Sequence, residues 1–136
     1  MTTLTDSEVP TKGARWAGYL LTALVAAFLT FDATIKLMVI QPVVDSFARL
    51  GLPADLPRTI GALEAALVIV YLVPRTAVLG GILLTGYLGG AIMCHVRVGD
   101  PMFSHILFPV YLGIVLWAGL YLRVIRVRHL IPVRPI

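Results

Sequence analysis

The chain has 136 residues, of which 59% are hydrophobic and 13% charged, with a formal net charge of +4. Because a soluble domain carries about a quarter charged residues, this composition excludes an ordinary water-soluble globular fold and favours a surface that faces lipid. The basic residues flank hydrophobic segments, so they indicate membrane topology and no nucleic-acid partner.

Met1–Pro10 is polar and contains Asp6 and Glu8, so we expect no secretory signal there. Four later stretches approach the roughly 20 apolar residues that a spanning helix needs. In chain order, the predicted spans are Trp16–Ile40, Leu56–Val73, Thr76–Val96 and Phe103–Leu122. The partly amphipathic connection Pro42–Asp55 can lie on the membrane surface as a half-turn or a short helix. The sequence therefore predicts an all-α, four-transmembrane-helix bundle, a single membrane domain over residues 1–136 with short cytoplasmic tails.

The third predicted span carries rows of small residues. Gly81, Thr85 and Gly89 recur four positions apart, and so do Gly86 and Gly90. Such rows let helix backbones approach closely inside a membrane. We expect them to pack within the bundle, with contact between two copies in a homo-oligomer as the alternative.

The positively charged residues predict the orientation. An even number of spans places both termini on one side, which carries seven Lys and Arg residues against three on the other. The seven are Lys12, Arg15, Arg75, Arg123, Arg126, Arg128 and Arg134, and the three are Arg49, Arg58 and Arg97. Because cytoplasmic segments carry the excess of Lys and Arg, we predict that both termini are cytoplasmic. An aromatic belt is expected at the same interface from Trp16, Tyr19, Tyr71, Trp117 and Tyr121.

Ionisable side chains inside a predicted span are functional candidates, because placing them in lipid is costly. Asp32 and Lys36 stand four positions apart on one helix face, in the order that favours an ion pair. Glu64 has no such partner on its own helix. It must therefore stay protonated, or meet water, Lys36, His95 or Arg58 across the bundle.

The topology brings Asp32, Lys36, Glu64 and His95 to a similar depth in the outer half of the membrane. His95 also shares a helix face with Tyr87, so these side chains predict an outward-facing polar pocket. The alternatives are a charged clamp that only specifies helix packing and, for His95, an interfacial position near water. The single cysteine and the absence of HxxxH or ExxH spacing predict no metal site.

Further motifs extend over most of the chain. They are Gly61-x-x-Glu64, Pro74-Arg75-Thr76, GILLTGYLGGA at Gly81–Ala91, His95, Arg97, Gly99-Asp100-Pro101, Pro109, Trp117 and the ending Leu122–Pro132. In this order, from about Trp16 to Pro132, the chain resembles the DoxX-like family of bacterial four-helix membrane proteins. The resemblance implies a location in the bacterial inner membrane. The wider group is named from a subunit linked to thiosulfate:quinone oxidoreduction, and other members are associated with oxidative-stress complexes.

Carried over from the family pattern, the matching positions are Glu64, His95 and Arg97, with Lys36 at the expected end of the first span. The chain has no cysteine pair, which argues against direct thiol redox chemistry. The candidate acid/base residues are Glu64 and His95, and the candidate ligand-binding residues are Asp32, Lys36, Tyr87 and Arg97.

Three functional hypotheses follow. The leading one is a membrane binding or accessory protein whose pocket holds a small lipophilic ligand, with a quinone as the candidate cofactor. Lys36 and His95 would donate hydrogen bonds to its carbonyl oxygens, and Glu64 would exchange a proton. The second is an acid/base enzyme on a lipophilic substrate, or the membrane subunit of an oxidoreductase whose redox partner protein holds the redox centre. The third is a structural or chaperone-like partner protein.

Overall fold

The computed structural model describes residues 9–131, and in this range the chain forms helices and no strand. The elements are α1 (Lys12–Met38), α2 (Gln41–Arg49), α3 (Leu56–Leu72), α4 (Ala77–Val98), the π-helical segment η1 (Met102–Ile106), α5 (Phe108–Arg123) and α6 (Ile125–Leu130). Asp6, Glu8, Pro132 and Arg134, which the sequence arguments used, lie outside the described residues. For the described part of the chain, the all-α prediction is confirmed.

The helices follow the four hydrophobic stretches, with ends that differ by a few residues. α1 begins at Lys12 instead of Trp16, because Thr11 caps it: the Thr11 Oγ1 accepts a 3.1 Å hydrogen bond from the backbone N–H of Ala14. α1 ends at Met38, and a turn at Val39 leads into α2, the nine-residue helix of the amphipathic connection.

Three helices are long and apolar enough to cross a membrane. They are Lys12–Met38, Ala77–Val98 and the continuous stretch Met102–Arg123, which combines η1 and α5. The other hydrophobic helix, α3, has 17 residues. At 1.5 Å per residue it is about 26 Å long, somewhat less than the roughly 30 Å of a bilayer's hydrocarbon core. Proline bounds α3 on both sides, since Pro57 lies in its first turn and Pro74 follows its end.

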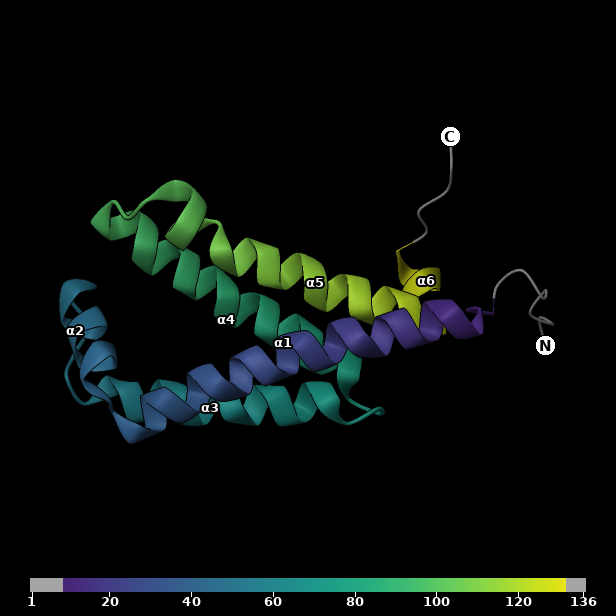
Figure 1. The fold of residues 1–136 in the computed structure, drawn as a ribbon, viewed down its shortest axis with the longest axis horizontal. Coiled ribbons are helices and arrows are strands. Elements are labelled where there is room, and N and C mark those ends of the chain that lie inside the picture. Colours follow the sequence, from purple (N-terminus) through teal and green to yellow (C-terminus); the bar gives the residue numbers. More distant parts are fainter. Residues whose placement is uncertain (1–8, 132–136) are drawn as a thin grey trace.

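α1 packs against α3 and α5, and α4 packs against the same two helices. α1 and α5 approach most closely where two glycines face each other: a Cβ added to Gly18 would lie 2.9 Å from the carbonyl oxygen of Gly119. Figure 1 shows the two helices running together at this end and separating toward the end that holds α2. The core lies on the closed side, around Val25, Leu84 and Leu116, and the diverging side leaves room for a cavity.

Tyr71 departs from the expected aromatic belt. It is fully buried in the core, where its hydroxyl lies 3.3 Å from the carbonyl oxygen of Leu116 and 3.4 Å from the Thr22 Oγ1. Trp16 and Tyr19, in contrast, are 69% and 52% exposed near the start of α1. Tyr71 is buried because it packs on Gly80, where an added Cβ would lie 2.4 Å from the Tyr71 Cα.

The small-residue rows of α4 pack inside the structure only at their beginning. Gly80 contacts Tyr71, and Gly81 packs on Leu120. A Cβ added to Gly86, Gly89 or Gly90 would meet nothing within 4 Å among the described residues. The expectation that both rows pack within the bundle is therefore wrong for Gly86, Gly89 and Gly90.

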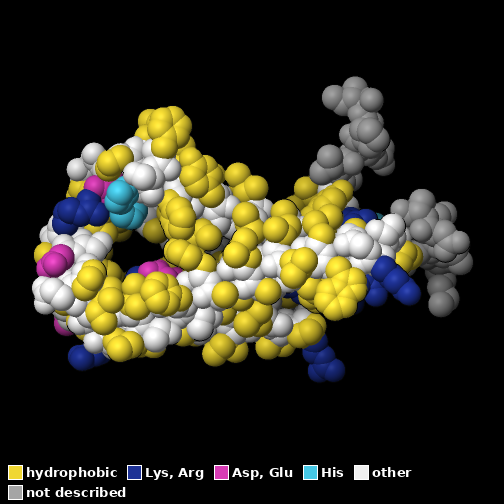
Figure 2. Space-filling view, in the orientation of Figure 1, with side chains coloured by type: hydrophobic (Ala, Val, Ile, Leu, Met, Phe, Trp, Pro, Cys, Tyr) yellow, Lys and Arg dark blue, Asp and Glu magenta, His cyan; other side chains and the backbone are white. Residues whose placement is uncertain are grey.

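The surface separates hydrophobic flanks from charged ends. Figure 2 shows hydrophobic side chains over the middle of the molecule, with Lys and Arg gathered toward both ends of its long axis. Large exposed side chains on these flanks include Leu20, Phe31, Ile69, Ile82 and Ile114. This distribution is the one expected of helices that cross a bilayer.

Candidate functional site

A cavity of about 560 Å³ lies where α1 and α5 diverge. It is lined by residues of α1, α2, α3, α4 and the first turn of α5, most of them apolar. Figure 2 shows an opening on the flank of the molecule, bordered by hydrophobic side chains and, toward the α2 end, by histidine, with acidic groups visible in its depth. The polar side chains that line the cavity are Asp32, Lys36, Ser46, Glu64, Tyr87 and His95.

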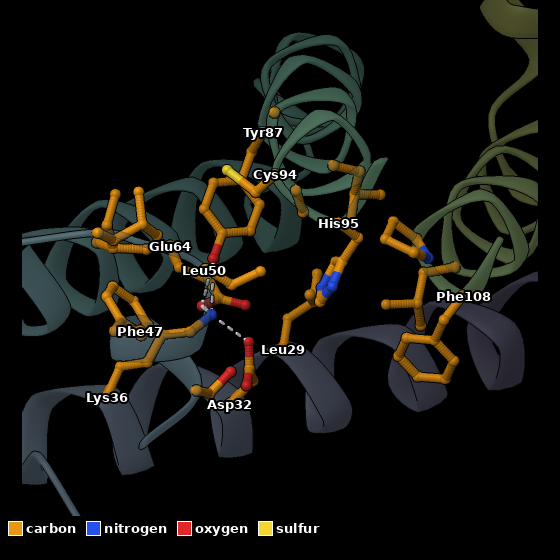
Figure 3. Close-up of a pocket in the computed structure, with 18 of the residues that line it drawn as sticks. Leu29, Asp32, Lys36, Phe47, Leu50, Glu64, Tyr87, Cys94, His95 and Phe108 are labelled. Carbon is orange, nitrogen blue, oxygen red and sulfur yellow. Dashed lines mark hydrogen bonds and ion pairs between the residues drawn. The ribbon is translucent and has the colours of Figure 1, made fainter. Parts of the chain in front are cut away.

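Lys36 is the centre of the polar cluster (Figure 3). Its Nζ donates hydrogen bonds to the Asp32 carboxylate one turn earlier on α1, to the Glu64 Oε2 at 2.8 Å and to the Tyr87 hydroxyl at 2.8 Å. The structure thus contains the intrahelical pair expected at positions 32 and 36. It also places Glu64 on Lys36, one of the partners considered for it.

Glu64 is the most enclosed member of the cluster, with a side chain that is 0% exposed. Its Oε2 accepts hydrogen bonds from Lys36 and, at 2.9 Å, from the Tyr87 hydroxyl. Its Oε1 is also buried and has no hydrogen-bond partner among the described residues. One oxygen of this carboxyl group is therefore fully used, and the other is buried and unpaired in a residue that lines the cavity.

A glycine one turn before Glu64 allows these contacts. A Cβ added to Gly61 would lie 2.9 Å from both the Ala33 carbonyl oxygen and the Lys36 Cβ. Because Gly61 has no side chain, α3 approaches α1 closely at the level of Lys36. The Gly61-x-x-Glu64 spacing thus places the glutamate one turn away on the face where the two helices meet.

His95 borders the cavity from the last turns of α4, but its side chain contacts Asp100 and not Lys36. Its Nδ1 lies 2.5 Å from the Asp100 Oδ2. Gly99 ends α4 in the left-handed conformation, with φ 71°, and turns the chain so that the Asp100 N–H bonds to the His95 carbonyl. Because a carboxylate only accepts, Nδ1 carries the ring proton in this contact. The hydrogen bond from His95 lowers the pKa of Asp100 below its ordinary 3.8.

Two arginines join α2 to the end of α4. Arg49 forms an ion pair with Asp100, which adds to the lowering of the Asp100 pKa. Arg97 donates to the backbone carbonyl of Leu50, at the end of α2. These contacts hold Phe47 and Leu50 of α2 over the cavity as one of its walls. We call the three residues Arg49, Arg97 and Asp100, together with the Leu50 carbonyl, the α2 clamp.

The structure brings together five of the six candidates. Asp32, Lys36, Glu64 and Tyr87 form one hydrogen-bonded cluster, and His95 lines the same cavity without contacting them. Arg97, the sixth, does not line the cavity and contacts α2 instead.

Sequence reasoning missed the role of Asp100 and the contact between two aromatic side chains that line the cavity. Phe28 of α1 and Phe108 of α5 meet there edge to face, with ring centroids 5.2 Å apart. The signal for Asp100 was present in the Gly-Asp pair that follows α4, since such a glycine returns the next residue to the end of the helix. Nothing in the sequence indicates the pairing of Phe28 with Phe108.

The arrangement suits an organic ligand better than a metal ion. Within residues 9–131, no group of three or more His, Cys, Asp or Glu side chains is placed to hold a metal. A cavity that is mostly apolar with a few convergent polar groups is typical of small-molecule sites. Glu64 is the group best placed to accept or release a proton there, because one of its oxygens is unpaired.

Comparison with models of known protein families gives a match. A model of the DoxX-like family matches residues 20–119 of the chain. This range includes α2, α3, α4 and η1 in full and most of α1 and α5, and it contains all the cavity-lining residues. No curated protein and no solved structure matches.

Proposed function

Since the chain belongs to the DoxX-like family, we propose that it is a four-span protein of the bacterial inner membrane that binds a small lipophilic ligand in its cavity. A quinone is the leading candidate for this ligand. The observation that carries the proposal is the unpaired Oε1 of Glu64, buried beside an apolar cavity of about 560 Å³. Such a volume falls in the range of small-molecule sites, roughly 300–1,000 Å³.

The route of entry supports a lipophilic ligand. The opening in Figure 2 lies on the flank of the molecule, with hydrophobic side chains on the rim opposite the α2 end. In a bilayer these flanks face acyl chains, so a molecule dissolved in the membrane reaches the cavity without crossing water. Phe28, Phe47 and Phe108 supply aromatic walls for an apolar body, and the polar cluster holds its head group.

The proposed topology has both termini in the cytoplasm and α3 as the fourth span. α3 is short, but α1 and α4 pack against it, and the carboxyl group of Glu64 faces these neighbours instead of lipid. With the excess of Lys and Arg on the cytoplasmic side, the cavity and the α2 clamp then lie toward the outer face of the membrane.

The first test is mass spectrometry of organic extracts from the gently purified protein. We expect a stoichiometric quinone or related lipid from the wild type and its loss from Glu64→Gln and His95→Ala. Asp55→Asn and His129→Ala are the matched controls, because both residues are exposed and neither lines the cavity. A ligand that is retained equally in all four variants would refute binding at this site.

The second candidate function is enzymatic. A carboxyl group that is held on one side by Lys36 and Tyr87 and is unpaired on the other has the arrangement of a general acid or base. The chain would then be an acid/base enzyme on a lipophilic substrate, or the membrane subunit of a quinone-linked oxidoreductase. Co-purification of a redox partner protein, with turnover abolished by Glu64→Gln, distinguishes it from simple binding.

A further inference from the structure

The hydrogen-bond donors of the polar cluster are all engaged. A lysine ammonium has three N–H groups. Those of Lys36 point to Asp32, Glu64 and Tyr87, one to each. The Tyr87 hydroxyl accepts from Lys36 and donates its own proton to Glu64. Neither Lys36 nor Tyr87 has an N–H or O–H left to donate to a ligand. The expectation that Lys36 donates to a carbonyl oxygen therefore does not fit the observed contacts.

The polar atoms without a partner that belong to the cavity-lining residues Glu64 and His95 are acceptors when Glu64 is ionised. The Oε1 of Glu64 has no partner among the described residues, and its side chain is fully buried. His95 gives its Nδ1 proton to Asp100, so the Nε2 of a neutral ring is an acceptor as well. With Asp32 and Glu64 both ionised, two carboxylates against one ammonium leave the cluster of Asp32, Glu64 and Lys36 with one excess negative charge. A carbonyl oxygen approaching Glu64 would therefore meet another acceptor and a negative potential.

We propose that the ligand is a hydrogen-bond donor: a lipophilic molecule with a hydroxyl head group, such as a hydroquinone, whose O–H donates to the Oε1 of Glu64. This inference rests on the proposed function and specifies the chemical class of its ligand. An unpaired buried carboxylate oxygen costs free energy that a ligand hydroxyl recovers, whereas a quinone carbonyl adds a second unpaired acceptor. The binding site would thus select the reduced form of a quinone–hydroquinone pair.

The test compares three compounds with the same decyl chain: a benzoquinone, its hydroquinone and the hydroquinone dimethyl ether. Binding to the full chain in lipid nanodiscs is measured by calorimetry, without oxygen and at pH 7. We expect the hydroquinone to bind at least about tenfold more tightly than the other two, the value of one hydrogen bond to a charged group. The ether separates donor chemistry from shape, because it keeps the oxygens and lacks the protons.

Glu64→Gln gives a second, opposite expectation. The glutamine carbonyl can take over the contacts with Lys36 and Tyr87, which leaves its NH₂ group, a donor, at the position of Oε1. The variant should lose the preference for the hydroquinone and bind it no more tightly than the dimethyl ether. Asp55→Asn serves as the control and should keep the wild-type order of affinities.

The outcomes separate this inference from the proposed function. Tight binding of the quinone and the hydroquinone with equal affinity, or of the quinone in preference, would overturn the donor inference and leave the cavity as a lipophile site. Binding of none of the three compounds would refute the proposed quinone-type ligand and the inference together. The wild-type comparison requires no substitution, so it decides the question even if Glu64→Gln fails to fold.

Discussion

At the scale of single residues, Lys36 has a structural role that is separable from ligand binding. Its ammonium contacts both carboxylates of the cluster, and its side chain is only 14% exposed. The position of Asp32 four residues earlier made the first contact predictable from helix geometry. The contact with Glu64 was one of four possibilities, because sequence spacing contains no information on which helices are neighbours.

Lys36→Met should destabilise the protein by about 3 kcal/mol, because it leaves the buried Glu64 and the partly exposed Asp32 without their counter-ion. The double variant Lys36→Met, Glu64→Gln should regain most of the loss, since it removes the more deeply buried charge as well. Thermal unfolding in detergent, followed by circular dichroism, measures both. A single variant as stable as the wild type would show that the cluster carries a proton instead of relying on Lys36.

At the scale of elements, the helices could be predicted from the sequence, but the convergence and divergence of α1 and α5 could not. Apolar length, the prolines that flank α3 and the glycine after α4 define the helices from sequence alone. The cavity depends on where α1 and α5 converge and diverge, which follows from Gly18 against Gly119 at one end and from bulky Phe28 against Phe108 further along. A glycine pair between two helices that are far apart in the sequence leaves no periodic signal in that sequence. The short helix α2 was foreseen as an option, but the α2 clamp was not.

The α2 clamp should weaken on acidification. The pKa of Asp100 is lowered in the folded protein by His95 and then Arg49, so the stabilising contact is present above pH 3.8 and is lost as the pH falls through the lower folded value. The neighbouring titratable group is His105, whose ring lies 5.7 Å from that of His95. A spin label at Ala48→Cys, in a Cys94→Ser background, reports the mobility of α2 by electron paramagnetic resonance.

We expect constant mobility from pH 7 down to about 4 and a rise below that range, since acidification then removes the Asp100 charge. Asp100→Asn should be mobile at every pH, and Asp55→Asn should follow the wild type. Mobility that rises near neutral pH in the wild type would assign the transition to a histidine and contradict the role of Asp100.

At the scale of the whole molecule, the charges at the two ends predict a membrane topology. The start of α1 and the end of α5 lie together, since Arg123 donates to the Thr22 Oγ1 at 2.9 Å, and α2 lies at the opposite end. Labelling of single cysteines in a Cys94→Ser background tests the proposed orientation. A membrane-impermeant maleimide should react with Ala54→Cys in intact spheroplasts and with Gly13→Cys only after lysis. Both residues are exposed, and Gly13 has open space around its Cα. The reverse pattern would invert the topology.

For the proposed lipophilic ligand, entry through the lateral opening would set the concentration scale of binding. A ligand that enters from the bilayer is already partitioned out of water, so occupancy follows its mole fraction among the lipids and not its vanishing aqueous concentration. The hydrophobic transfer of its tail has taken place before binding and contributes no selectivity. Selectivity among lipophilic ligands would then depend on the head group, which meets the few polar atoms around the buried Glu64 carboxyl group.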